Sequence, residues 1–367
     1  MPFKVPYTAF PQRIGPLKSE LMASIETVLD SGMYVLGENV REFEREFANY
    51  CGTEYSVGVA NGTCSLHLAL RALGIGPGDE VITASNSFIA SAGAIGVTGA
   101  KPVFADIAED LNIDPSKIEE AITENTRAIM PVHLTGRSAR MDQIMDIARR
   151  HKLAVIEDAA QAVGARWGNR TVGGFGDAAC FSLHPLKNLH AFGDGGMFVT
   201  NSESIFKDIL KLRNHGLESR DQCDFWGYNC RLDEIQAAVL RLFLARLDKW
   251  TERRRELAFR YNRLLSPYVT VPLEGDQEYH VYQTYVIQAD RRDGLQAHLR
   301  EKGVEALVHY PVPIHCQPAA HYLGYDTEDL PVTHLMAGRI LSLPLYPEME
   351  ERKQDYVVEQ VACFYEG

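Results

Sequence analysis

Short apolar runs and stretches with helical spacing alternate along the first two thirds of the chain. The apolar runs are rich in Val, Ile and Phe, which is typical of buried strands. They lie at 55–60, 79–85, 101–107, 126–134, 153–158, 178–184 and 195–200. Between them, helical spacing is clearest at 64–73, 87–97 and 139–152. Strands and helices that alternate in this way predict an α/β fold, with a mainly parallel sheet and helices on both faces.

The pattern changes near residue 232, where a long stretch of helical spacing begins and continues to residue 264. Beyond it come a further strand-like segment and a proline-rich segment at 309–318. A chain of 367 residues is long for a single hydrophobic core. We therefore expect a large domain at 1–245, which includes the N-terminal segment, and a smaller C-terminal α/β domain at 246–367.

Charge and composition narrow the class of protein. The net charge of −12 at pH 7 argues against non-specific binding to nucleic acid or to an anionic membrane surface. Because we find neither a secretory signal pattern nor an apolar run long enough to span a bilayer, we expect a cytoplasmic protein. The seven cysteines form no CxxC pair, and the histidines lack the spacing of metal ligands. Neither a disulfide framework nor a metal site is predicted.

Three strand ends carry residues that could take part in chemistry. The first is Asn61-Gly62-Thr63, which lies between a predicted strand and a predicted helix. Free N–H groups at a helix N-terminus bind phosphate, and a glycine there lets an anion approach closely. The same three residues could also form a plain turn in which Thr63 caps the helix. Taken alone, the segment leaves both interpretations open.

The second strand end is Glu157-Asp158, followed by Gln161. In open α/β sheets, ligands bind beyond the carboxyl ends of the strands. A carboxylate at this place could face a cationic ring nitrogen, or it could only cap a following helix. The sequence alone favours the helix cap.

The third strand end leads to Lys187, which follows the apolar run at 178–184. An arbitrary lysine on a loop is usually a solvated surface residue. An amine held at the end of a sheet strand, however, can react with a carbonyl group once its pKa is lowered. A phosphate cradle, a carboxylate and a lysine are the three anchors that pyridoxal phosphate needs, for its phosphate, its ring nitrogen and its aldehyde. In this order on this fold, the three together predict a site for pyridoxal phosphate.

These features resemble those of the DegT/DnrJ/StrS family of sugar aminotransferases, which share the aspartate-aminotransferase fold. The segments that carry the resemblance are SGMYVLGENVREFEREFANYCG (31–52), NGTCSLHLAL (61–70), IEDAAQAVGA (156–165), FGDAACFSLHPLKNL (175–189), GYNCRLDEIQAAVL (227–240), YPVPIHCQP (310–318) and LSLPLYPEM (341–349). They cover nearly the whole length of the chain. The resemblance implies a transferase of fold type I that depends on pyridoxal phosphate.

The resemblance also implies a role for individual residues around the cofactor ring. Lys187 would bind the aldehyde as a Schiff base, Asp158 would pair with the pyridine nitrogen, and Gln161 would contact the ring hydroxyl. Phe88 would stack on the ring, although from spacing alone it could equally be a buried core aromatic.

The phosphate of the cofactor would be held from two sides. The resemblance assigns it to the amides of Gly62 and Thr63 and to the hydroxyl of Ser182. It further implies that Asn229 reaches the phosphate of the neighbouring subunit, so that the active unit is a homodimer with shared sites. From the sequence alone, Asn229 could simply be a turn residue.

The implied reaction is transamination from L-glutamate to a keto group on a nucleotide-linked sugar. Gln161 together with GDGG at 193–196 resembles the branch that aminates C-3, so we expect C-3 of a dTDP-3-keto-6-deoxyhexose as the acceptor. Tyr310 and His315 are candidates for lining the sugar-nucleotide pocket, or else they belong to a proline-stiffened loop. The alternatives are a 4-keto nucleotide sugar, an aminocyclitol, or a regulatory protein that binds the cofactor without turnover.

Two positions depart from the pattern of the family. Cys230 stands where an aromatic residue is usual, and Gln283 stands where a histidine is common. Both departures concern the expected sugar pocket more than the cofactor chemistry. Lys187 is present, which favours transamination over the dehydratase chemistry of family members that replace this lysine.

Overall fold

A seven-stranded sheet forms the centre of the computed structural model, which describes residues 3–367. The strand order is β1-β9-β8-β5-β4-β2-β3. The strands are β1 (Tyr55–Val59), β2 (Glu80–Ala84), β3 (Lys101–Ala105), β4 (Thr126–Met130), β5 (Ala154–Asp158), β8 (Ala178–Ser182) and β9 (Gly196–Thr200). Strand β9 runs antiparallel to both of its neighbours, β1 and β8, and the other pairs are parallel. The predicted α/β class and mainly parallel sheet are confirmed.

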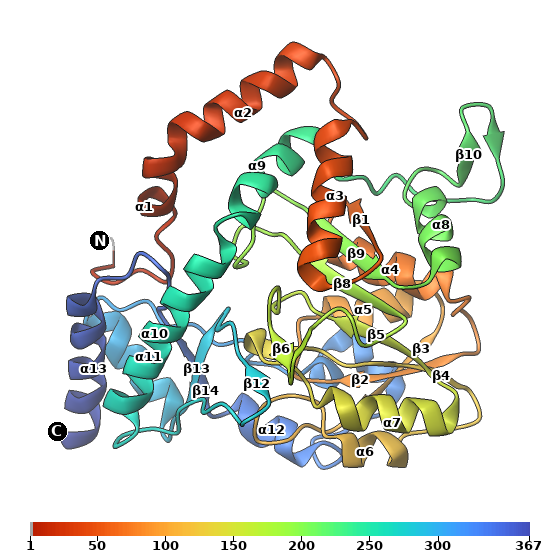
Figure 1. Ribbon diagram of the computed structural model, residues 1–367. Coiled ribbons are helices and arrows are strands. Elements are labelled where there is room, and N and C mark those ends of the chain that lie inside the picture. Colours follow the sequence, from red (N-terminus) through yellow and green to blue (C-terminus); the bar gives the residue numbers. More distant parts are fainter. Residues whose placement is uncertain (1–2) are drawn as a thin grey trace.

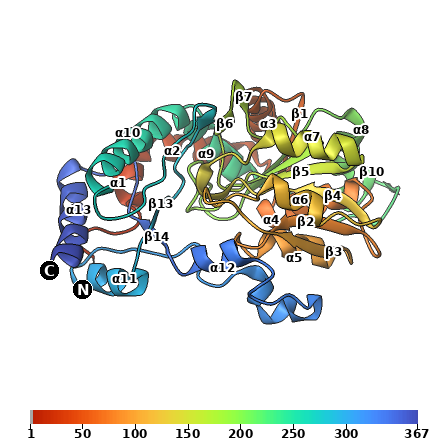
Figure 2. The same ribbon diagram turned by 90° about the horizontal axis from the view of Figure 1, so that it is seen from below.

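Helices cover both faces of this sheet. Successive side chains of a strand point to opposite faces, and here the side chains on both faces are apolar and need to be buried. Met130 and Phe198 pack on one face and Ile129 and Met197 on the other. The helices on the first face are α4 (Gly62–Ala72), α5 (Ala90–Val97) and α8 (Glu203–Leu212), and those on the second are α3 (Glu38–Cys51), α7 (Met141–His151) and α9 (Glu234–Leu244). Figure 2 shows α7 and α5 on opposite sides of the sheet.

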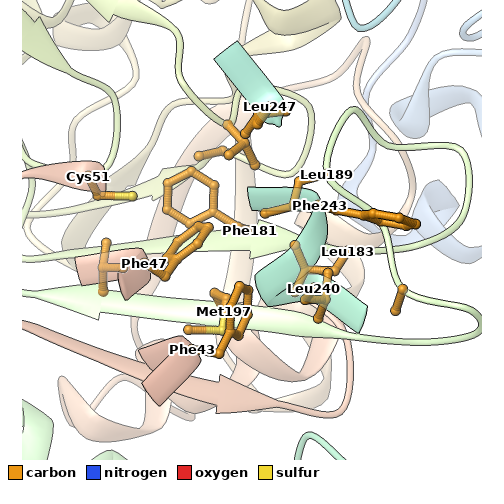
Figure 3. Close-up of a cluster of buried hydrophobic side chains, with 14 of the residues drawn as sticks. Phe43, Phe47, Cys51, Phe181, Leu183, Leu189, Met197, Leu240, Phe243 and Leu247 are labelled. Atoms are coloured by element: carbon orange, nitrogen blue, oxygen red, sulfur yellow. The ribbon is translucent and has the colours of Figure 1, made fainter. Parts of the chain in front are cut away.

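One buried cluster holds α3 and α9 against the end of the sheet that carries β8 and β9 (Figure 3). Phe47 of α3 meets Phe181 of β8 edge to face, with ring centroids 5.1 Å apart. Phe243 of α9 and Leu183, just after β8, belong to the same cluster and are fully buried. The loop that follows β8 therefore starts from a rigid, well-packed strand end.

The helical stretch expected as one unit over 232–264 is two helices in the structure. Helix α9 ends at Leu244, and α10 (Leu247–Leu265) begins after a short break at Ala245 and Arg246. Neither Gly nor Pro marks this break in the sequence. Helix α9 and Leu247, the first residue of α10, pack in the cluster with α3 and the central sheet. From Leu257 onward, α10 packs in a different cluster with α13 (Glu351–Glu366) (Figure 1). The break therefore lies close to the point where the helical stretch passes from one core to the other.

The C-terminal third builds its own core around the two-stranded sheet of β13 (Tyr285–Gln288) and β14 (Ile340–Leu343). Helices α10, α11 (Arg292–Glu301) and α13 pack against it. Val5, near the N-terminus, joins this cluster and forms an isolated parallel bridge with Val304. The division into domains at 1–245 and 246–367 remains a prediction.

The remaining α-helices and strands are short or lie at the periphery. They are α1 (Phe10–Ile14), α2 (Lys18–Ser31), α6 (Pro115–Glu120), β6 (Arg166–Trp167), β7 (Arg170–Thr171), β10 (Leu217–Ser219), β11 (Gln222–Cys223), β12 (Glu278–Tyr279) and α12 (Pro331–Ala337). Figure 1 shows the β10–β11 hairpin projecting from the body of the molecule. Within residues 3–367, none of the helices combines the length and the apolar character needed to cross a bilayer.

Candidate active site

Lys187 lies in the loop between β8 and β9. Its backbone N–H donates to the carbonyl of His184 at 2.8 Å, which closes a turn just beyond the end of β8. The next residue, Asn188, is buried and donates from its side chain to the carbonyl of Val281 at 3.0 Å. Burial lowers the pKa of Lys187 to about 8, and the charge of Asp158 partly opposes this shift. The amine is therefore far closer to its neutral, nucleophilic form at neutral pH than an ordinary lysine is.

Asp158 is the last residue of β5 and is buried. Its Oδ2 accepts a hydrogen bond from the hydroxyl of Ser91 at 2.7 Å, and its Oδ1 accepts one from the N–H of Ala160 at 3.2 Å. No α-helix follows Asp158, so it is not a helix cap. Burial raises the pKa of Asp158, while Ser91 and the amine of Lys187 counteract that rise.

The N-terminus of α4 lies against the end of β8. A Cβ placed on Gly62 would come within 2.9 Å of the Cβ of Ser182, so only a glycine allows this approach. Asn61, and not Thr63, caps the helix, because its side chain accepts from the N–H of Cys64 at 2.8 Å. In the described part of the chain, the N–H groups of Gly62 and Thr63 have no acceptor. Two free donors beside a serine hydroxyl form a cradle for an anion.

Gln161 and Tyr310 are in direct contact. The side-chain carbonyl of Gln161 accepts from the N–H of Thr135 at 2.6 Å, and its amide group donates to the hydroxyl of Tyr310 at 3.2 Å. The ring of Tyr310 lies 5.6 Å from that of Phe88, centroid to centroid. Phe88 is 54% exposed, which rules out the alternative of a core aromatic. Burial and the nearby charge of Asp158 raise the pKa of Tyr310, so these side chains lie in the neighbourhood of Asp158.

Two predicted site residues lie apart from these contacts. His315 is buried, and its Nδ1 is 2.6 Å from the hydroxyl of Ser85, which follows β2. Asn229 is exposed and forms an isolated bridge with Asn214. Its side-chain oxygen accepts from the Nε of Arg231 at 2.8 Å. Neither residue contacts Lys187 or Asp158 within this chain.

Several further residues support the site without having been singled out from the sequence. Ser91 binds Asp158, and Thr135 holds Gln161. His309, half-buried, is bound through Nδ1 to the hydroxyl of Ser342 at 2.8 Å, and its pKa falls to about 4 through burial and the nearby charge of Lys187. Only Ser91 left a signal in the sequence, since it lies three residues after Phe88 in the same predicted helix.

Comparison with known proteins places this site in a family. A model of the DegT/DnrJ/EryC1/StrS aminotransferase family matches residues 16–362. The chain belongs to this family. The enzyme class is therefore that of an aminotransferase, and the dependence of the family on pyridoxal phosphate confirms the predicted cofactor.

Individual members of the family are similar over nearly their whole length. A pleiotropic regulatory protein of Geobacillus stearothermophilus is 46% identical, with 98% of each chain covered. A dTDP-3-amino-3,4,6-trideoxy-alpha-D-glucose transaminase of Streptomyces venezuelae is 43% identical, covering 98% of this chain and 95% of that protein. The crystal structure of S. venezuelae DesV in complex with a ketimine intermediate matches with a TM-score of 0.97 at 43% identity, covering 100% of both chains. The predicted fold type is confirmed by this match.

Proposed function

We propose that the chain transfers an amino group from L-glutamate to C-3 of a dTDP-linked 3-keto-6-deoxyhexose, with pyridoxal phosphate as its cofactor. The observation that carries the proposal is the convergence of Lys187, Asp158 and the anion cradle of Gly62, Thr63 and Ser182 at one edge of the sheet. The relative that is named a 3-amino sugar transaminase, at 43% identity over nearly the whole chain, supports C-3 as the position of transfer.

The residues present fit the cofactor at each of its polar ends. The free N–H groups at the start of α4 would hold the phosphate together with Ser182, and Gly62 provides the room. Asp158 and Lys187 interact electrostatically, yet no ion pair joins them in the structure of residues 3–367. Asp158 is therefore available to a ring nitrogen, and the amine of Lys187 is available to an aldehyde on the same ring. Phe88, exposed and beside Tyr310, is free to lie on the face of such a ring.

Proton transfer would rest on two side chains. Pyridoxal phosphate supplies, when bound, a conjugated ring that can accept the electron pair left at the α carbon of an amino acid. The buried charge of Asp158 would keep the ring nitrogen protonated, which makes the ring a stronger electron acceptor. The Nζ amine of Lys187, with its lowered pKa, is suited to remove the proton from the α carbon and to return it during transfer.

We further propose a homodimer in which Asn229 of one subunit contributes to the phosphate site of the other. The exposure of Asn229, and its lack of contact with Lys187 in its own chain, support this proposal. Apolar side chains that lie exposed on and after α2 support an interface as well; they are Met22, Leu29, Met33, Tyr34 and Val35. A cytoplasmic location and glutamate as the donor remain predictions.

The deciding experiment measures 2-oxoglutarate release from glutamate with a 3-keto and, separately, a 4-keto nucleotide sugar, and locates the new C–N bond by NMR. We expect amination at C-3. Amination at C-4 alone would overturn the assignment of C-3 as the acceptor position, but it would leave the assignment of aminotransferase activity intact. Turnover of an aminocyclitol ketone alone would do the same.

A control decides whether the protein is an enzyme or a regulator. Borohydride should fix the cofactor to Lys187 in wild type, and Lys187→Ala should lose turnover by orders of magnitude. Cofactor binding by wild type with no transfer to any acceptor would favour the regulatory alternative. The relative named a pleiotropic regulatory protein makes this the rival worth testing.

A further inference from the structure

Two thiols meet where the segment before α9 crosses the first turn of α4. The Sγ atoms of Cys64 and Cys230 are 3.4 Å apart, and the thiol of Cys230 donates to Cys64. Both side chains are half-buried, so small reagents can reach them. A disulfide requires a bond of about 2.05 Å. The two sulfurs already touch, and they must come closer still for the bond to form.

The backbone on each side of the pair is fixed by hydrogen bonds. The N–H of Cys64 donates to the side chain of Asn61, the cap of α4. The N–H of Cys230 donates to the carbonyl of Arg213 at 2.9 Å. One turn further along α4, the rings of His67 and Tyr228 pack edge to face with centroids 4.9 Å apart. The segment around Cys230 therefore contacts α4 at two successive turns of the helix. The contact between the two sulfurs is one of these two contacts.

The two thiols differ in their chemistry. The hydrogen bonds from Cys230 and Asn61 lower the pKa of Cys64 to about 7, although burial and the charge of Asp194 act in the other direction. The same contact raises the pKa of Cys230. Cys64 also lies in the first turn of α4, where the helix N-terminus stabilises a thiolate. Because thiolates are the nucleophiles in thiol–disulfide exchange, Cys64 is the thiol that reacts first. Cys230 lies in position to complete the exchange.

We propose that Cys64 and Cys230 form a site of reversible thiol–disulfide exchange with low-molecular-weight disulfides. The thiolate of Cys64 attacks one sulfur of the reagent disulfide, forms a mixed disulfide and releases one thiol. The sulfur of Cys230 then loses its proton, attacks Cys64 and releases the second thiol. The protein loses two electrons and two protons, and the reagent gains them as two thiols. Disulfides of this kind inside cells are usually transient and serve redox sensing.

The bond would tie the first turn of α4 to the segment that carries Asn229. The first turn of α4 belongs to the cofactor site of its own chain, and Asn229 belongs to the site proposed for the partner subunit. Both sites of the dimer would therefore respond to the thiol–disulfide balance; this consequence alone rests on the proposed function. A metal is a poor alternative occupant, because within residues 3–367 no group of three or more His, Cys, Asp or Glu side chains is placed to hold one.

The test treats folded protein with oxidised glutathione and maps disulfides by peptide mass spectrometry. We expect a Cys64–Cys230 link within one chain, reversed by a reducing thiol. In the Cys230→Ser variant, the exchange should stop at a mixed disulfide between glutathione and Cys64. In the Cys64→Ser variant, Cys230 should remain largely unmodified. Exposed Cys223 serves as the comparison thiol and should react more slowly than Cys64. Absence of the link in folded protein, or a link only between chains, would overturn the proposal.

A second measurement separates this proposal from the proposed function. Hydrogen exchange of residues 228–231 should slow in the oxidised protein, and treated Cys230→Ser should show no such change. Cofactor loss during dialysis should also differ between oxidised and reduced wild type. If the link forms but the rate of loss is unchanged, redox control of the site is wrong. If neither form binds the cofactor, the proposed function fails while the thiol site stands.

Discussion

At the scale of single residues, the site depends on burying a cation and an anion near each other without pairing them directly. Burial pushes the pKa of Lys187 down and that of Asp158 up, and the attraction between the two charges opposes both shifts. For Lys187 burial is the larger effect, which leaves its pKa at about 8. A lysine tuned in this way can carry and release a proton near neutral pH.

This balance predicts the pH dependence of Lys187 in the cofactor-free protein. Only the neutral amine reacts with an acylating reagent, so labelling of Lys187 should rise through about pH 8, compared with about 10.4 for ordinary lysines. Asp158→Asn removes a charge that raises the pKa of Lys187, so the midpoint should move to lower pH in that variant. Peptide mapping of the label across pH measures both midpoints. A midpoint unchanged by the substitution would show that the two charges are not coupled.

Asp158 and Ser91 offer a matched pair of substitutions. Asp158→Asn keeps the shape but removes the charge opposite the proposed ring nitrogen. Loss of one partner of a buried ion pair costs about 3–5 kcal/mol, so the transamination rate should fall by about 10²- to 5 × 10³-fold. Ser91→Ala removes one hydrogen bond to the carboxylate and should cost only about tenfold. Single-turnover rates with glutamate measure both effects, and equal losses in the two variants would contradict a role for the charge itself.

At the scale of elements, the seven apolar runs of the sequence correspond to the seven strands of the central sheet. The pattern succeeds there because these strands are buried on both faces. It fails at Ala245 and Arg246, where the helical stretch breaks close to its passage from the core of the central sheet to the C-terminal core. It also could not show that Ser91 binds Asp158 or that Thr135 holds Gln161, since these contacts form only when segments far apart in the sequence meet in the folded chain.

The N-terminus of α4 gives a test at this scale. Gly62→Ala should weaken cofactor binding, because the new methyl group would press on Ser182 in the anion cradle. Gly62 does not have a positive φ, so the substitution adds no backbone strain of its own. The matched control is Gly96→Ala in α5, where a Cβ meets nothing within 4 Å; there alanine should be neutral or slightly stabilising. Absorbance titration with pyridoxal phosphate measures affinity, and thermal unfolding confirms that both variants fold.

At the scale of the whole molecule, several exposed features are consistent with the proposed homodimer. The β10–β11 hairpin projects from the body (Figure 1), and Trp226 beside it is 89% exposed. Asn229 lies between this hairpin and α9, on the exposed side of the segment whose Cys230 touches α4. In the proposed homodimer, a partner subunit would cover these side chains and would supply its own Asn229 to the anion cradle.

The shared site predicts how two inactive variants behave when mixed. Suppose that each site uses Lys187 of one subunit and Asn229 of the other. A dimer of one Lys187→Ala chain and one Asn229→Ala chain then holds one site with both lesions and one site with neither. Refolding or exchanging the two variants together should therefore recover activity, up to one intact site per mixed dimer, whereas each variant alone stays impaired. If each chain instead supplied all residues of its own site, mixing would give only the average of the two parents, and an assay of the mixture against that average decides between the two arrangements.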